Sequence, residues 1–118
     1  MNLNKLLKEL LGKTGLPVEQ DEYTGKKDKY IIFVYEDEHP AAHADNAVTD
    51  DTAYIQVQLI TPKDYNYFTL KQKIRNLLEG ADFSVTSIRS FLGDVANGTE
   101  KTRQTIFHTE YTQGRRNE

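Results

Sequence analysis

The residues best suited to chemistry gather in one stretch, YEDEHPAAHADNAVTDDTAY, at positions 35–54. It contains two histidines four positions apart, His39 and His43, and it contains no lysine or arginine. Its carboxylates are Glu36, Asp37, Glu38, Asp45, Asp50 and Asp51. Such a stretch can hold a metal ion, supply an acid–base pair, or form a polar connection between two strands.

A metal site would require the two histidines to share a face. They would do so if Pro40 opened a helical turn, with Asp45 as a third ligand. The metalloprotease pattern needs a glutamate directly after the first histidine, and Pro40 stands there instead. We therefore predict neither a metal site nor a cofactor, and keep a metal-dependent enzyme using His39 and His43 as the lesser alternative.

Acid–base catalysis would require two carboxylates in different environments, one of them desolvated. The acidic residues here flank an exposed connection, so solvated charge explains them better. We expect no catalytic residues and no enzymatic activity.

The elements around this stretch follow from hydrophobic periodicity and turn residues. Leucines spaced three and four apart predict a first helix ending at Gly12, and strand and helix patterns follow it. The expected ranges are a weak strand that residues 15–18 lead into and that ends near Tyr23, strands at 30–35 and 52–61, a helix at 67–79, and strands at 83–92, with a bulge, and 103–112. The order α-β-β-β-α-β-β predicts a two-layer α+β domain, with an antiparallel or mixed sheet of about five strands and both helices on one face. Residues 1–118 should form this single domain, with 113–118 as a disordered tail.

Charge and composition exclude several classes of function. The net charge is -3, so the chain lacks the overall positive field typical of nucleic-acid-binding proteins. Lys71, Lys73 and Arg75 lie on the second predicted helix, away from its apolar stripe, where solvated cations are expected; a nucleic-acid-binding module remains an alternative. No cysteine is present, and no run of about 20 apolar residues predicts a membrane span.

The combination of elements resembles the small tail terminator, or tail completion, proteins of long-tailed bacteriophages and prophages. The resemblance covers nearly the whole chain. After the amphipathic first helix it is carried by Leu16-Pro17-Val18, Tyr23-x-Gly25, Tyr30-Ile31-Ile32-Phe33, Ala44-Asp45-Asn46, Tyr54-Ile55-Gln56-Val57, Ile74-x-x-Leu77-Leu78, Ile106-Phe107-His108 and Tyr111.

This resemblance implies a structural virion protein, made in the bacterial host cytoplasm and located in the tail. Members of the family form a homo-oligomeric ring, a hexamer, on the head-proximal end of the tail tube. The ring contacts the tube protein and the head connector, and DNA passes through it as cargo. Another minor tail or head–tail connector component is the alternative.

A ring of this kind needs two different complementary patches on each subunit. We expect the carboxylates of positions 36–51 to form one such interface or to line the channel. Lys71, Lys73 and Arg75 are the candidate complementary interface.

Overall fold

The chain folds into two helices and five strands, in a computed structural model that describes residues 3–44, 47–94 and 101–114. Within these, side chains are described for 3–36, 52–93 and 102–112. The elements are α1 (Leu3–Gly12), β1 (Val18–Gln20), β2 (Tyr30–Ala44), β3 (Ala47–Pro62), α2 (Phe68–Gly80), β4 (Ser84–Asp94) and β5 (Lys101–Gly114). This order confirms the predicted α-β-β-β-α-β-β arrangement and the α+β class.

All five strands belong to one mixed sheet with the order β1-β2-β3-β5-β4. β2, β3, β5 and β4 pair antiparallel, whereas β1 pairs parallel to β2, with Val18 opposite Ile31. The parallel pair makes the sheet mixed, which is one of the two predicted arrangements. The pair is parallel because segment 21–29 returns the chain to the end of the sheet at which β1 began.

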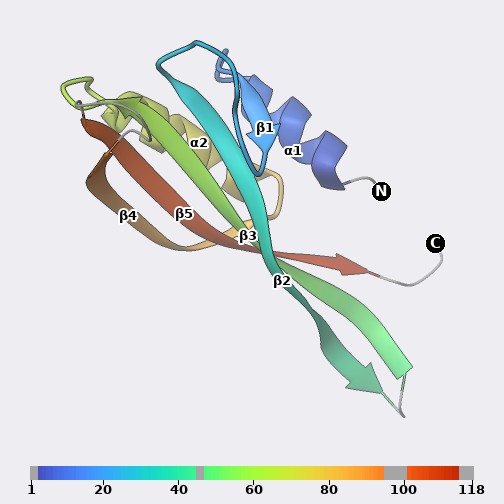
Figure 1. Cartoon of the computed structure of the whole chain (residues 1–118). Coiled ribbons are helices and arrows are strands. Elements are labelled where there is room, and N and C mark those ends of the chain that lie inside the picture. The colour runs from blue at the N-terminus through green and yellow to red at the C-terminus, as the bar shows by residue number, and fades with distance from the viewer. Residues whose placement is uncertain (1–2, 45–46, 95–100, 115–118) are drawn as a thin grey trace.

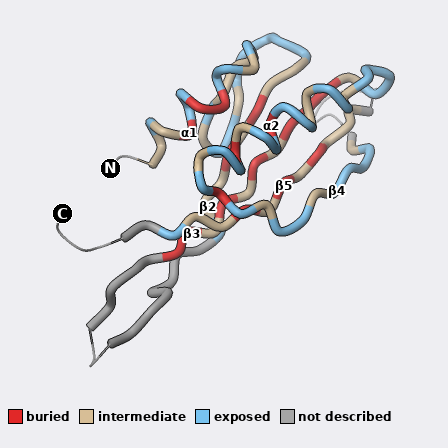
Figure 2. The backbone as a smooth tube through the Cα atoms, turned by 180° about the vertical axis from the view of Figure 1, so that it is seen from behind, coloured by how far each residue is buried: buried red, intermediate tan, exposed pale blue. Residues whose placement is uncertain are grey.

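Both helices cover the same face of the sheet (Figures 1 and 2). Their apolar residues and the inward-facing residues of β2, β3 and β5 form one buried cluster, which includes Leu7, Leu11, Phe33, Val57, Ile74, Leu78 and Phe107. Fully burying one such side chain contributes roughly 1.5–3 kcal/mol. The leucine face of α1 thus packs against the core, and a helix of this length requires such packing to be stable.

The opposite face of the sheet is not covered by a helix in the described part of the chain (Figure 1). Side chains alternate between the two faces of a strand, so the neighbours of the core residues point here. On β3 these are Gln56 and Gln58, and on β5 they are Ile106 and His108. The face is a mixture of polar and half-buried apolar groups.

β2 and β3 continue well beyond the helices as a long hairpin (Figure 1). The described molecule measures 56 × 24 × 23 Å, with a radius of gyration of 15.8 Å. A compact domain of this length would have a radius of about 13–14 Å. The projecting hairpin accounts for the elongation.

The largest differences from the expected boundaries lie after Tyr35 and at the end of β5. The stretch taken as a connection after Tyr35 is mostly strand, because β2 runs to Ala44 and β3 begins at Ala47. β5 runs to Gly114, two residues into the segment predicted as a disordered tail, while 115–118 lie outside the described residues. The predicted bulge in β4 is confirmed as a register shift between Val85 and Ser87.

Candidate interaction surface

The projecting part of the hairpin comprises residues 36–44 of β2 and 47–51 of β3, and we call it the acidic arm. Its base is three-stranded, because β5 pairs with β3 as far as Asp50 opposite Gly114. β1 covers β2 only at 31–33, so the outer edge of β2 has no neighbouring strand along the arm in the described chain.

Strand pairing brings the predicted acidic residues of the two strands into one region. Asp37 and Glu38 lie opposite Tyr54 and Ala53, and Asp51 lies opposite Pro40. Asp50 pairs with Ala42. Asp45 lies outside the described residues, and of the arm's side chains only that of Glu36 is described.

The arm concentrates negative charge without internal compensation, since no lysine or arginine occurs within it. No acid of one strand lies directly opposite an acid of the other in the described register; Glu38 and Asp51 are diagonal neighbours, about 7–8 Å apart. Two unit charges at that distance repel by roughly 0.5 kcal/mol in water. A cationic partner would relieve this repulsion.

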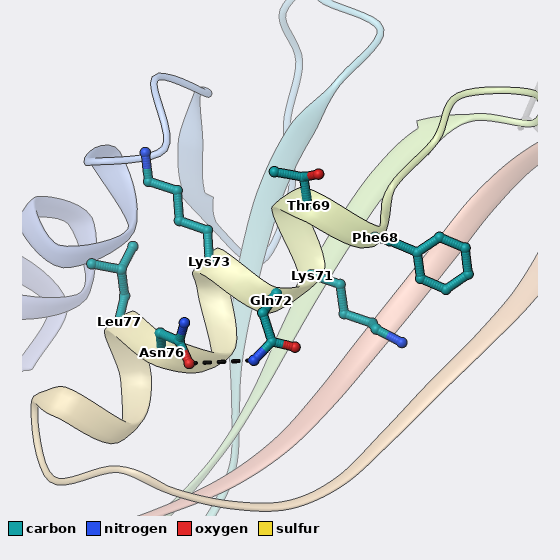
Figure 3. A pocket seen from close by; sticks show the side chains of 7 residues that line it. All are labelled: Phe68, Thr69, Lys71, Gln72, Lys73, Asn76 and Leu77. Carbon is teal, nitrogen blue, oxygen red and sulfur yellow. Dashed lines mark hydrogen bonds between the residues drawn. The ribbon is translucent and has the colours of Figure 1, made fainter.

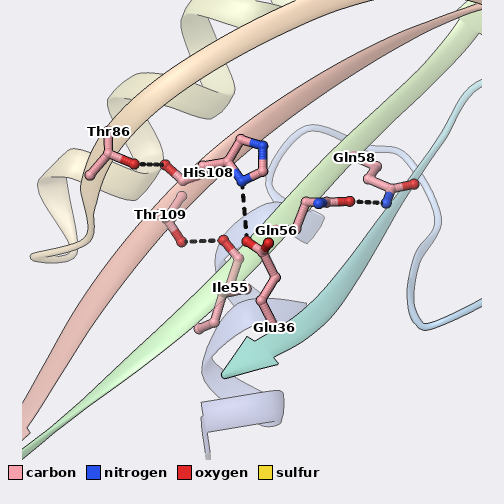
Figure 4. Close-up of polar contacts among 7 residues, drawn as sticks. All are labelled: Glu36, Ile55, Gln56, Gln58, Thr86, His108 and Thr109. Carbon is pink, nitrogen blue, oxygen red and sulfur yellow. Dashed lines mark hydrogen bonds and ion pairs between the residues drawn. The ribbon is translucent and has the colours of Figure 1, made fainter. Parts of the chain in front are cut away.

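Glu36 marks the base of the arm. The register shifts between Tyr35 and Asp37, so Glu36 is an extra residue in β2 with no pairing partner in β3. Its Oε1 lies 3.1 Å from Nδ1 of His108 on β5 (Figure 4). The two side chains retain 38% and 33% exposure, respectively. The contact crosses β3 on the uncovered face.

The three predicted cations of α2 do not form one patch. Lys71 and Lys73 point in different directions from the helix (Figure 3). Nε of Arg75 lies 3.5 Å from Oε2 of Glu79, so its charge has a partner one turn along the same helix. Lys73 is exposed. Lys71 and Lys73 line an open surface depression together with Phe68, Thr69, Gln72, Asn76 and Leu77.

Aromatic and cationic side chains gather at the end of the sheet opposite the arm, and we call them the cation–aromatic cluster. Its members are Lys29, Tyr65, Tyr67, Phe68, Lys71 and Arg103. They come from the start of β2, the connection after β3, the start of α2 and the start of β5. Asn66 fixes the entry into α2, because its Oδ1 accepts a hydrogen bond from the backbone N–H of Phe68 at 3.2 Å.

Each cation of the cluster lies over an aromatic ring. Lys29 Nζ is 4.9 Å from the Tyr65 centroid, and Arg103 Cζ is 5.1 Å from that of Tyr67. Lys71 Nζ is 5.1 Å from the Phe68 centroid. Sequence reasoning found Lys71 but missed the rest, although the aromatic run from Tyr65 to Phe68 at a strand–helix junction was a readable signal.

The structure overturns the basis of the histidine metal site. Residues 36–44 are β-strand, so Pro40 opens no helical turn, and register shifts on both sides of Ala42 disturb the regular alternation near His43. Within the described residues no group of three histidine or acidic side chains is arranged to hold a metal ion. No helix in the same residues is long and apolar enough to cross a bilayer.

Comparison with known proteins identifies the fold without a function. No family model and no curated protein matches the sequence. Thirteen solved chains match in structure. One of them is 17% identical, covers 98% of this chain and 93% of its own, and superposes with a TM-score of 0.51. That protein bears no functional name, and at this identity the likeness shows a shared fold and nothing further.

Proposed function

We propose that this chain is a structural tail protein of a phage or prophage, which forms a ring that ends the tail tube and joins it to the head. The resemblance noted in the sequence supports the proposal, since the residues that carry it build the fold. Tyr30–Phe33 lie in β2, Tyr54–Val57 in β3, and Ile74 and Leu78 form the buried side of α2.

The observation that carries the proposal is the shape and charge of the subunit. A cation-free arm projects from one side of the helix-covered body (Figure 1). The cation–aromatic cluster lies at the other end. Two different complementary patches on one subunit produce head-to-tail contacts, which close into a ring when the rotation allows. An enzyme of this size would instead need a concave site with convergent polar groups.

Carboxylates also suit a channel that conducts DNA. Cations lining such a channel would bind the passing phosphates and release counterions, which would hold the DNA in place. No lysine or arginine occurs between Lys29 and Lys63, a segment that contains the whole acidic arm. In the proposed ring the DNA is cargo, and the lasting partners are other copies, the tube protein and the head connector.

Electron microscopy tests the function directly. The purified protein is examined alone and after incubation with tail tubes assembled from the tube protein of the same phage. We expect rings, and tubes of defined length that bear a cap at one end. Tubes that remain uncapped and keep elongating in its presence would rule out a terminator.

Another head–tail connector component is the alternative within the same class. It would bind the connector or the side of the tail and would leave tube length unchanged. A metal-dependent enzyme differs in a separate way, because replacing His39 and His43 with alanine would abolish its activity. The structural proposal expects those two replacements to leave capping largely intact.

A further inference from the structure

We propose that the cation–aromatic cluster is the docking surface for the acidic arm of a second copy of this chain. The closure of such contacts into a ring rests on the proposed function. The contact itself follows from the charges and placement of described residues, and it assigns Lys71 and Arg103 as the cations that receive the arm.

Two cations of the cluster have no negative partner among the residues that the structure describes. Among the described residues, neither Lys71 nor Arg103 has a carboxylate within ion-pair distance, whereas Lys29 Nζ lies 3.3 Å from Oδ1 of Asp28. Arg75 on the neighbouring turn of α2 is paired as well. The unsatisfied positive charge therefore concentrates where Lys71 and Arg103 lie over Tyr67.

The aromatic rings hold these two cations in place. Tyr67 and Phe68 stack with centroids 4.9 Å apart, and Lys71 and Arg103 each lie over a ring of this pair. Arg103 also donates from Nη1 to Oγ of Ser90 at 3.5 Å. Cations held in this way lose little side-chain entropy when a carboxylate arrives, and a guanidinium can bind both of its oxygens.

Phe68 supplies the apolar part of the surface. Its side chain is 58% exposed, the most exposed of the large hydrophobic residues described, and Tyr65 is 37% exposed. Exposed aromatic rings beside arginine are typical of the centre of protein interfaces.

The complementary surface is present on the same chain. The arm carries carboxylates from two paired strands and no cation, and it lies at the far end of the 56 Å subunit. The strand directions explain why the cluster lies far from the arm. Lys29 directly precedes the first residue of β2, and Arg103 lies near the start of β5, so both are at the end of the sheet away from the arm. The distance prevents an arm from reaching its own cluster, so the contact must join two copies.

Single-stranded nucleic acid is the competing ligand for a basic aromatic surface. Bases need free ring faces, and here Tyr67 and Phe68 already stack on each other and bear cations. The net charge of -3 further disfavours a polyanion. A second copy fits the observations better.

A reciprocal charge exchange tests the contact. One variant carries Lys71→Glu and Arg103→Glu, and the other carries Asp37→Lys and Glu38→Lys. Sedimentation velocity should show self-association weakened at least about tenfold in each variant, because the charges of the arm and the cluster are then no longer complementary. An equimolar mixture should recover it, since the native arm of the first variant meets the native cluster of the second, and the reversed arm of the second meets the reversed cluster of the first. Lys73→Glu with Arg75→Glu is the matched control on the same helix and should associate as the native chain does.

Cysteine trapping locates the contact. Because the chain has no cysteine, Phe68→Cys and Glu38→Cys introduce unique thiols. Oxidising a mixture of the two single variants should give mainly the mixed disulfide dimer, whereas Glu9→Cys on the exposed side of α1 should give little with either.

Several results would overturn the assignment. These are charge reversal without effect, a mixture that fails to recover association, absence of the mixed disulfide, or Lys71- and Arg103-dependent binding of a single-stranded oligonucleotide with unchanged self-association. Rings that cap tail tubes but resist charge reversal would remove this inference and leave the proposed function standing. Charge-dependent association by a protein that never caps tubes would do the opposite.

Discussion

The carboxylate of Glu36 on β2 lies 3.1 Å from the imidazole of His108 on β5, across the intervening strand β3 (Figure 4). The bulge at Glu36 makes this reach possible, because an extra residue re-aims the side chain instead of pairing with β3. The contact joins the base of the acidic arm to the C-terminal strand. It is the one described side-chain link between the arm and the rest of the sheet.

A double-mutant cycle with Glu36→Gln and His108→Gln should reveal a coupling free energy of at most about 1 kcal/mol, because both side chains are about one-third exposed. Urea unfolding of the four proteins measures it. Glu110→Gln removes a charge from the same strand and serves as the control, and should show no coupling to Glu36. A zero coupling for Glu36 and His108 would mean that the contact does not form in solution.

Two phenylalanines on neighbouring strands test the assignment of the sheet faces. Phe107 on β5 is fully buried under the helices, whereas Phe91 on β4 is 43% exposed. Phe107→Ala should lower the free energy of unfolding by about 3–5 kcal/mol, since it leaves a cavity in the core. Phe91→Ala, the matched control, should cost less than about 1.5 kcal/mol. Equal losses in chemical denaturation would contradict the two-layer arrangement.

The hydrophobic pattern of the sequence was sufficient to predict the two layers of the fold, but it did not predict the acidic arm. The alternation along 53–59 and the spacing of Ile74 and Leu78 report burial directly, so β3 and α2 could be predicted. Residues 36–44 contain acids, alanines and Pro40, which have low strand propensity. Pairing with β3 overrides that propensity, and Pro40 is tolerated because β2 has a free outer edge and a register shift there.

The cation–aromatic cluster illustrates the other limit. Lys29, Tyr67 and Arg103 are far apart in the chain, and only the antiparallel register of β2, β3 and β5 brings their ends together. Each residue alone reads as an ordinary surface position. The charge asymmetry between the two ends of the molecule therefore depends on the strand order, and no local sequence pattern encodes that order.

Tyr30 gives the fold a predictable response to alkaline pH. Burial, and secondarily the charge of ionised Tyr23, raises the pKa of Tyr30 above its ordinary value of 10.0. The two rings stack with centroids 4.3 Å apart. Because the folded-state pKa is the higher one, the stabilisation is complete below pH 10 and is lost as the pH rises toward the folded-state pKa.

Replacing Tyr30 with phenylalanine should therefore remove part of the decline in unfolding free energy above pH 10. Denaturant unfolding of both proteins at a series of alkaline pH values measures the difference. Tyr65→Phe controls for the loss of a hydroxyl elsewhere on the chain. Parallel declines in the native protein and Tyr30→Phe would show that ionisation of Tyr30 is not linked to folding.

Neutralising the acidic arm should separate assembly from folding. The variant carries Glu36→Gln, Asp37→Asn, Glu38→Gln, Asp50→Asn and Asp51→Asn. The thermal unfolding temperature should be unchanged or slightly raised, because the substitutions remove weak repulsion between neighbouring like charges, roughly 0.5 kcal/mol for a pair 7–8 Å apart. Ring formation and tube capping, followed by sedimentation and electron microscopy, should be impaired, since the arm would no longer attract a cationic surface.

The control variant changes net charge equally while sparing the arm. It carries five substitutions of the same two types at exposed positions of the body, namely Glu9→Gln, Asp21→Asn, Glu22→Gln, Asp64→Asn and Asp82→Asn. If assembly depended on total charge alone, both variants would fail alike. If the arm variant caps tubes and supports infection as the native protein does, the arm is only a projecting hairpin. Loss of capping in the arm variant alone would instead tie assembly to carboxylates held on two paired strands beyond the core.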